Sequence, residues 1–510
     1  MDWENIAEDK KARIAASIPP EWRLTSAPTE DSVMDYPKKS GIMTADELAI
    51  TESSATDLVA KMAEGQLTSV AVTTAFCKRA ALATQLTNCT LEFFPELALA
   101  RAKELDETFK MTGKVVGPLH GLPISLKDQF RIKGLETSMG YIAWVGKVDK
   151  ADSVLVTLLL KAGAVFYVKT SVPQSLMVCE TINNVIGRTV NPRNKNWSCG
   201  GSSGGEGAMI GFRGGIIGVG TDIGGSIRVP SAFNFLYGLR PSHGRLPYAK
   251  MANSMEGQET VHSVCGPLTH SIKDMRLFVT SVLAEEPWKY DSKVIPLPWR
   301  QSEADAIKTK LSAGGLTLGY YDCDGVVLPH PPILRGVNTV VSTLKAAAIP
   351  NFADLINPSL PKIDMNELWA VQLQKWAYQS EYLEQFRLAE ETLGKEIDAI
   401  IAPITPTAAI RHNQFKYYGY ASAINLLDFT SVVVPVTWAD KNVDKKKEGY
   451  KALNDIDEAV QAECESPFRV WRAYDGAPVA VQIVGRRLTE ERIMAIAEEI
   501  GRLLGNEITP

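Results

Sequence analysis

Two serines, each preceded by a pair of glycines, are the residues best suited to do chemistry in this chain. Gly200 and Gly201 precede Ser202, and Gly224 and Gly225 precede Ser226. Glycine lets the backbone approach a ligand closely and adopt positive φ, so that successive N–H groups can converge on one oxyanion. The N–H groups of residues 223–226 can all face an oxyanion beside the Ser226 hydroxyl. Because a serine is a weak nucleophile without a base, this arrangement also needs a proton acceptor from elsewhere in the chain.

Other interpretations of this glycine-rich stretch fit the sequence less well. Glycine makes up twelve of the twenty-six residues from 200 to 225. A dinucleotide-binding fingerprint would need glycine where Ile223 stands, and no Gly-Lys-Ser/Thr completes a phosphate loop. A nucleophile elbow at Ser203 satisfies Gly-x-Ser-x-Gly, but the polar residues 194–199 precede it where an elbow needs an apolar strand. The pattern favours a catalytic frame around the two serines and leaves the elbow as an alternative.

The composition is that of an ordinary globular protein. The chain has 510 residues, of which 45% are apolar and 22% charged, and its net charge of −5 gives no cationic field that would attract nucleic acid. Seven widely spaced cysteines without a Cys-x-x-Cys pair predict reduced thiols and a cytoplasmic location. No window of about eighteen residues is apolar enough to cross a bilayer. The six histidines lack metal-binding spacing, so we expect no metal and no cofactor.

The elements that must position these serines alternate between helix and strand. Residues 1–50 are polar and interrupted by prolines, which predicts an arm of short helices lying on a larger body formed by residues 51–510. Apolar residues at helical spacing predict helices in the segments 56–64, 69–81, 96–110, 154–161, 277–283, 365–388 and 490–503. Apolar runs predict strands at 164–169, 397–403, 431–437 and 477–485, and the charged stretch 440–465 predicts a solvated insertion. This alternation, without an internal repeat, predicts an α/β fold with a single-domain mixed β-sheet sandwiched between helices.

Four motifs occur in order over about a hundred residues. They are Gly121-Leu-Pro-Ile-Ser-Leu-Lys127-Asp, Ser171-Val-Pro-Gln-Ser, Gly200-Gly-Ser202-Ser-Gly-Gly-Glu-Gly-Ala and Gly220-Thr-Asp-Ile-Gly-Gly-Ser226-Ile-Arg. Together they resemble the amidase signature family, whose members are serine hydrolases with a Ser-Ser-Lys triad in place of Ser-His-Asp. The resemblance extends more weakly over residues 55–505. Within the family the chain looks most like the fungal acetamidase-type enzymes, judging by the amino-terminal Trp-Glu-x-Ile-Ala and the run 234–248.

The resemblance implies a role for each residue of the triad. It makes Ser226 the nucleophile, Ser202 a bridging serine at a cis peptide, and Lys127 the base. Lys127 must be neutral to accept a proton, so burial has to lower a pKa that starts near ~10.4. By the same resemblance, the oxyanion is held by the N–H groups of Ile223, Gly224, Gly225 and Ser226, and the substrate pocket is lined by Leu176.

Four further residues are expected to support the triad. Asp222 and Arg228 flank the nucleophile and are predicted to form an ion pair that fixes the loop without taking part in the chemistry. Ser203 is interpreted as a supporting hydrogen-bonding residue, and Thr221 is assigned to the same supporting group.

The implied reaction is hydrolysis of a carboxylic amide to an acid and an amine or ammonia through an acyl-enzyme on Ser226. One alternative is an esterase or acyl transferase with the same triad, since an acyl-enzyme can form from an ester or pass to another nucleophile. The other is the amidotransferase subunit that works on charged transfer RNA, against which the missing basic patch and the amino-terminal arm argue. We expect a small-molecule amide as substrate, no nucleic-acid partner and no membrane span. If the chain assembles, we expect a homodimer.

Overall fold

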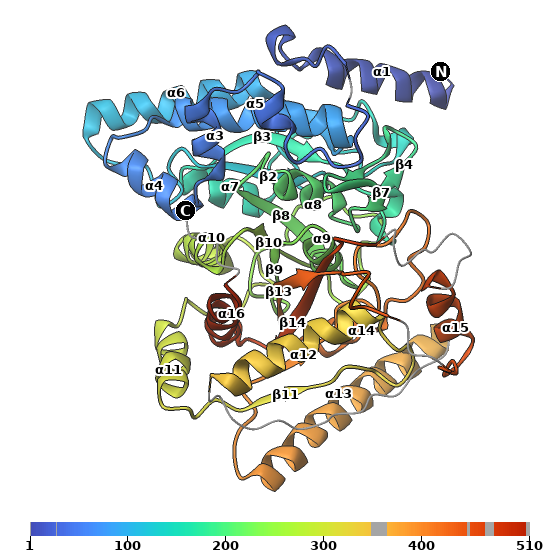
Figure 1. Cartoon of the computed structure of the whole chain (residues 1–510). Helices are drawn as coiled ribbons and strands as arrows, with labels where there is room; N and C mark the ends of the chain where they lie inside the picture. The colour runs from blue at the N-terminus through green and yellow to red at the C-terminus, as the bar shows by residue number, and fades with distance from the viewer. Residues whose placement is uncertain (1, 27, 348–364, 446–448, 465–473, 506–510) are drawn as a thin grey trace.

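A mixed sheet of ten strands runs through the molecule (Figure 1). The computed structural model describes residues 2–26, 28–347, 365–445, 449–464 and 474–505. Residues 446–448 and 465 of the predicted charged insertion lie outside the described residues, as do residues 1 and 27 of the predicted arm and 348–364, 466–473 and 506–510 of the predicted body. The strands, in their spatial order, are β1 (Thr90–Phe93), β3 (Val165–Thr170), β2 (Pro123–Lys127), β8 (Ile217–Asp222), β10 (Val264–Thr269), β9 (Tyr237–Arg240), β13 (Thr430–Trp438), β14 (Pro478–Gly485), β12 (Ala399–Ala402) and β11 (Leu318–Tyr320).

The pairing of these strands confirms the predicted mixed sheet. Strand β2 pairs in parallel with both β3 and β8, and β11 pairs in parallel with β12. The other neighbouring pairs are antiparallel. Two small hairpins lie outside the large sheet and are formed by β4 (Ile182–Asn183) with β5 (Gly187–Arg188), and by β6 (Val190–Asn191) with β7 (Asn194–Ser198).

Helices cover both faces of the sheet, as the α/β interpretation requires. They are α1 (Trp3–Ala16), α2 (Tyr36–Lys39), α3 (Ala45–Glu52), α4 (Ala55–Ala63), α5 (Ser69–Thr87), α6 (Pro95–Thr112), α7 (Val154–Lys161), α8 (Gly204–Gly211), α9 (Arg228–Phe233), α10 (Ile272–Ala284), α11 (Gln301–Ser312), α12 (Pro331–Ala346), α13 (Met365–Leu393), α14 (Gly419–Leu427), α15 (Asp455–Gln461) and α16 (Glu490–Leu504). All seven helices and four strands expected from the sequence are present, with ends that differ by a few residues.

The two-sided burial is clearest along β13. Successive side chains of a strand point to opposite faces, and Val432 and Val434 pack in the same apolar cluster as α16, whereas Val433 packs with Val229 and Phe233 of α9. A strand covered on both faces has a continuous apolar run, which is why residues 431–437 could be predicted as a buried strand.

The ends of α4 and α6 are determined by local capping residues. Helix α6, predicted over 96–110, ends at Gly113, and this residue takes the left-handed φ of +66° that glycine adopts without strain. Helix α4, predicted to begin at Thr56, begins one residue earlier at Ala55, and its capping residue is Ser54, whose hydroxyl accepts a hydrogen bond from the backbone N–H of Asp57. Thr56 lies inside the first turn, where its N–H donates to Asp274 at the start of α10.

The amino-terminal segment is attached to the rest of the chain by buried charges as well as apolar contacts. In Figure 1 α1 lies at the top of the molecule and α13 at the bottom. Helix α1 contacts β1. Lys10 of α1 is buried and forms ion pairs with Glu92 on β1 and Glu136. Trp22, farther along, packs in the same apolar cluster as α5. Of the helices that the structure describes, none combines the length and the apolar character needed to span a bilayer.

Candidate active site

The ends of two parallel strands bring Lys127, the expected base, and Ser226, the expected nucleophile, to the same edge of the sheet. Lys127 is the last residue of β2, and Ser226 follows β8 by four residues. Since β2 and β8 are paired in parallel, their carboxyl ends meet at one edge, where ligands bind in open α/β sheets. Ser202 arrives from the loop that starts α8, which packs on β2 and β8, and the peptide bond from Gly201 to Ser202 is cis.

Lys127 lies against Ser202 in a fully buried position. Its Nζ donates hydrogen bonds to Ser202 Oγ and to Thr221 Oγ1, both at 2.7 Å. Burial lowers the pKa of Lys127 to about 7, although the negative charges of Asp222 and Glu206 act in the opposite direction. An amine with a pKa near neutrality can exchange a proton with a neighbouring hydroxyl, so this lysine has the property that a general base needs.

Ser226 faces open space and is surrounded by unused backbone donors. Within the described residues, the Ser226 hydroxyl has no hydrogen-bond partner, and none joins it to Ser202. The N–H groups of Ile223, Gly224 and Ser226 likewise find no acceptor within the part of the chain that the structure describes. Unpaired N–H groups beside a serine hydroxyl can stabilise an oxyanion that forms there.

The structure does not direct all four of the expected N–H groups to that point. The N–H of Gly225 donates to Asp222 Oδ1 at 2.8 Å, so it is not available to an oxyanion in this conformation. The reason is the tight turn after β8, in which Gly225 adopts a φ of +114° and folds back over the Asp222 carboxylate. A Cβ at this position would lie 2.7 Å from the Cβ of Ala421, so the turn also has no room for a side chain.

Asp222 and Arg228 form a buried ion pair that organises this turn. Both guanidinium contacts to the carboxylate measure 3.0 Å, and both side chains are fully buried. Asn425 and the N–H of Ile227 also donate to Asp222, and Arg228 donates further to Gln482 on β14. Burial acts to raise the pKa of Asp222, but the Arg228 charge and these hydrogen bonds outweigh it and hold the pKa well below its usual range. The carboxylate thus stays charged and anchors the loop that carries Ser226.

Removing the charge of Asp222 is expected to destabilise the fold. Asp222→Asn keeps the size of the side chain but leaves Arg228 as a buried cation without its carboxylate, at a cost of about 3–5 kcal/mol in the free energy of unfolding. Urea unfolding followed by fluorescence measures this difference. The matched control is Asp475→Asn, which breaks the more exposed ion pair with Lys441 and should cost at most about 1 kcal/mol. Equal losses in the two variants would contradict the anchoring role of Asp222.

The environment of Ser203 differs from that of Ser202 and Ser226. Its hydroxyl accepts from the N–H of Thr221 and lies 3.3 Å from the Thr221 carbonyl, and its side chain is fully buried. Its N–H donates to the Ser226 carbonyl. Ser203 therefore links β8 to the start of α8, and it does not line the cavity, as a nucleophile at an elbow would.

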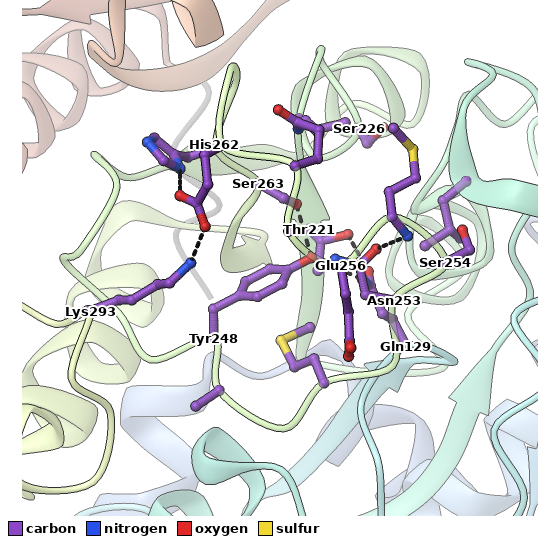
Figure 2. A pocket seen from close by; sticks show the side chains of 18 of the residues that line it. Gln129, Thr221, Ser226, Tyr248, Asn253, Ser254, Glu256, His262, Ser263 and Lys293 are labelled. Carbon is purple, nitrogen blue, oxygen red and sulfur yellow. Dashed lines mark hydrogen bonds and ion pairs between the residues drawn. The ribbon is translucent and has the colours of Figure 1, made fainter. Parts of the chain in front are cut away.

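Two cavities meet at Ser226. One has a volume of about 330 Å³ and a mixed polar lining that includes Ser202. Figure 2 shows Thr221 and Gln129 on the wall of this cavity. The other, of about 440 Å³, is mostly apolar and reaches Tyr418. Leu176, predicted as a pocket residue, lines both cavities, as do Ile223 and Ser226. A bound molecule can thus place one group on each side of the serine hydroxyl.

Three residues at the site were not anticipated from the sequence. Gln129 and Tyr248 line the polar cavity and are hydrogen-bonded to each other. Glu206 lies in α8 and is fully buried, which raises its pKa to about 8 despite hydrogen bonds from Ser125 and Thr170. Its position amid glycine, alanine and methionine in α8 was a usable signal, because an acidic residue in a wholly apolar helix must find a polar partner. No comparable signal marked Tyr248, which lies 119 residues from Gln129.

Comparison with known proteins identifies the family of this chain. The sequence model of the family described as Amidase matches residues 71–365 and 350–494. The chain belongs to the amidase family. It is similar to the acetamidase of Emericella nidulans, with 66% identity over 551 aligned residues covering 100% of both chains. It is also 61% identical to the acetamidase of Aspergillus oryzae, with 99% of each chain covered.

Among solved structures, the chain is similar to a fatty acid amide hydrolase. The TM-score is 0.90 at 32% sequence identity, and the match covers 99% of this chain and 95% of that one. These comparisons confirm the family, the fold and the amide hydrolysis that the motifs implied. The chain is therefore an enzyme that hydrolyses amides.

Proposed function

We propose that the chain hydrolyses small carboxylic amides, acetamide among them, through an acyl-enzyme on Ser226. The observation that carries the proposal is the contact of a buried lysine, with a pKa of about 7, with the hydroxyl of Ser202 beside the cavity that Ser226 lines. The choice of acetamide is supported by the names of the two fungal relatives at 66% and 61% identity.

The reaction uses the chain's own groups for each proton. Neutral Lys127 accepts the proton of Ser202 while Ser202 accepts the proton of Ser226, and Ser226 Oγ forms a bond to the amide carbon. The N–H groups of Ile223, Gly224 and Ser226 donate to the resulting oxyanion. The proton then returns through Ser202 to the nitrogen, the C–N bond breaks, and the amine or ammonia leaves. Water attacks the acyl-enzyme by the same relay, releasing the acid and restoring Ser226.

A substrate panel tests this function. We expect acetamide to be turned over with the highest kcat/KM, longer aliphatic amides and anilides with lower values, and the matched acetate esters by the same serine. Turnover of esters without any turnover of amides would contradict the proposal and favour the esterase. Co-purification with partner subunits and RNA would favour the amidotransferase subunit.

We also propose that the enzyme is cytoplasmic. Six of its seven cysteines are free thiols in the part of the chain that the structure describes, and five of these are buried. Burial raises the pKa of Cys77, Cys179, Cys199 and Cys265 above its ordinary range, so these thiols are protonated and unreactive at neutral pH. Unpaired thiols are what a reducing compartment maintains.

A further inference from the structure

A continuous chain of hydrogen bonds leads away from Lys127 along the wall of the polar cavity. Lys127 Nζ contacts Thr221 Oγ1 at 2.7 Å, and Thr221 Oγ1 contacts Gln129 Oε1 at 2.8 Å. Gln129 Nε2 contacts Tyr248 Oη at 2.8 Å, and Tyr248 Oη contacts Ser263 Oγ at 2.9 Å. Figure 2 shows Thr221, Gln129, Tyr248 and Ser263 joined in this order.

The protonated state of Lys127 fixes the direction of every bond in this chain. An ammonium group has only donors, so Thr221 must accept from it and can use its one hydroxyl proton only toward Gln129. Gln129 therefore presents its carbonyl oxygen to Thr221 and its NH₂ group to Tyr248. Tyr248 accepts this bond and donates to Ser263.

The same direction is retained when Lys127 loses its proton. Reversal would require the Gln129 amide to turn by about 180° and two hydroxyl groups to rotate at the same time, which breaks three bonds in a mostly buried site. With Thr221 still an acceptor, neutral Lys127 keeps one N–H on Thr221, and its lone pair is free to point to the Ser202 hydroxyl.

We infer that Gln129, held by Tyr248, is a positioning residue that keeps the lone pair of neutral Lys127 directed at Ser202. This inference rests on the proposed triad and adds to it a part that lies outside the four motifs. Gln129 acts through Thr221 and Lys127, whereas the triad residues exchange protons with one another.

The surroundings of Gln129 fit a positioning role. The residue is only 2% exposed, and both ends of its side-chain amide are bonded, so the amide has one allowed orientation. Burial raises the pKa of Tyr248 to about 12, so the phenol remains protonated and can donate to Ser263 over the working pH range. Ser263 lines the cavity, and the chain of bonds ends there.

The test is to replace Gln129 by methionine, which has nearly the same length and no hydrogen-bonding group. We expect kcat to fall about 10- to 100-fold with KM changed less than about threefold, because substrate binding is retained while the base loses its orientation. Thr221 would then be free to donate to Lys127 and draw its lone pair away from Ser202. Unchanged kcat in Gln129→Met would overturn the inference.

A second variant, compared with Gln129→Met, separates the effect of orientation from that of packing. Gln129→Glu retains an acceptor for Thr221 and should restore most of kcat relative to Gln129→Met. Its added negative charge should move the acid limb of the pH profile of kcat/KM to higher pH, because it favours protonated Lys127. The other charges that face Lys127 come from Asp222 on β8 and Glu206 on α8, with the Cys179 thiol nearby, and both variants leave them in place. Equal kcat in Gln129→Met and Gln129→Glu would contradict a positioning role.

The matched control is Gln85→Met in α5. Gln85 accepts from the N–H of Leu24 and donates to the carbonyls of Trp22 and Ala81, and it is not among the residues that line the polar cavity. This variant loses three side-chain hydrogen bonds, against two in Gln129→Met, but should lower only the thermal stability, with kcat and the pH profile unchanged. Failure of the triad itself would appear as full activity in Ser226→Ala, which distinguishes that outcome from a failure of the inference about Gln129.

Discussion

Replacing Ser226 with alanine is expected to lower kcat for amide hydrolysis by about 10⁴-fold or more while leaving the fold intact. The side chain faces the two cavities and makes no hydrogen bond within the described residues, so the hydroxyl can be removed without leaving a buried group unpaired. The activity that remains should come only from substrate binding and from the backbone N–H groups that stabilise the oxyanion. Steady-state assays with acetamide measure the loss, and circular dichroism checks the fold.

The control for this variant is Ser203→Ala. Ser203 has a hydroxyl in the same stretch of sequence, but it is bonded to Thr221 and shielded from the cavity. Its removal should reduce stability and reduce kcat far less than the loss of Ser226. A fluorophosphonate should label Ser226 alone. Labelling of Ser203 instead would show that Ser203 is the nucleophile, as the nucleophile-elbow alternative requires.

The sequence was sufficient for the local elements because their signals are local. The continuous apolar run of β13 and the glycine at the end of α6 each reflect forces that act within a few residues. The strand order could not be predicted in the same way. Strand β10 pairs between β8 and β9 although it follows both in the chain, and only the packing of the whole sheet determines such an insertion.

The site, like the fold, could be predicted only in part from the sequence. Lys127, Ser202 and Ser226 lie in motifs with a recognisable order, so their meeting at one sheet edge could be expected. The Gly225 N–H was predicted to face an oxyanion, and its bond to Asp222 depends on the detailed turn, which no spacing rule specifies. Gln129 was missed because its significance comes from Tyr248, a residue distant in sequence and close in space.

Lys127→Met is expected to have the second large effect, a loss of kcat of at least about 10³-fold, because no other group replaces the base. In the unchanged enzyme kcat/KM should rise with pH through a midpoint near the Lys127 pKa of about 7, since only the neutral amine accepts a proton. In the methionine variant the residual kcat/KM should not show this rise with pH. Rates measured from pH 5.5 to 9 with acetamide as substrate test both statements.

The same variant should become more stable, and by more at low pH. The pKa of Lys127 is lowered in the fold from the value near ~10.4 that it has in the unfolded chain, so the unfolded state binds more protons between the two values. The unfavourable contribution of Lys127 is therefore absent above the unfolded pKa, grows as the pH falls, and is complete below about pH 7. Loss of the bonds to Ser202 and Thr221 subtracts an amount that does not depend on pH. The difference in Tm between Lys127→Met and the unchanged enzyme should be more positive at pH 6 than at pH 9, and the opposite order would show that Lys127 is not held near neutrality by burial.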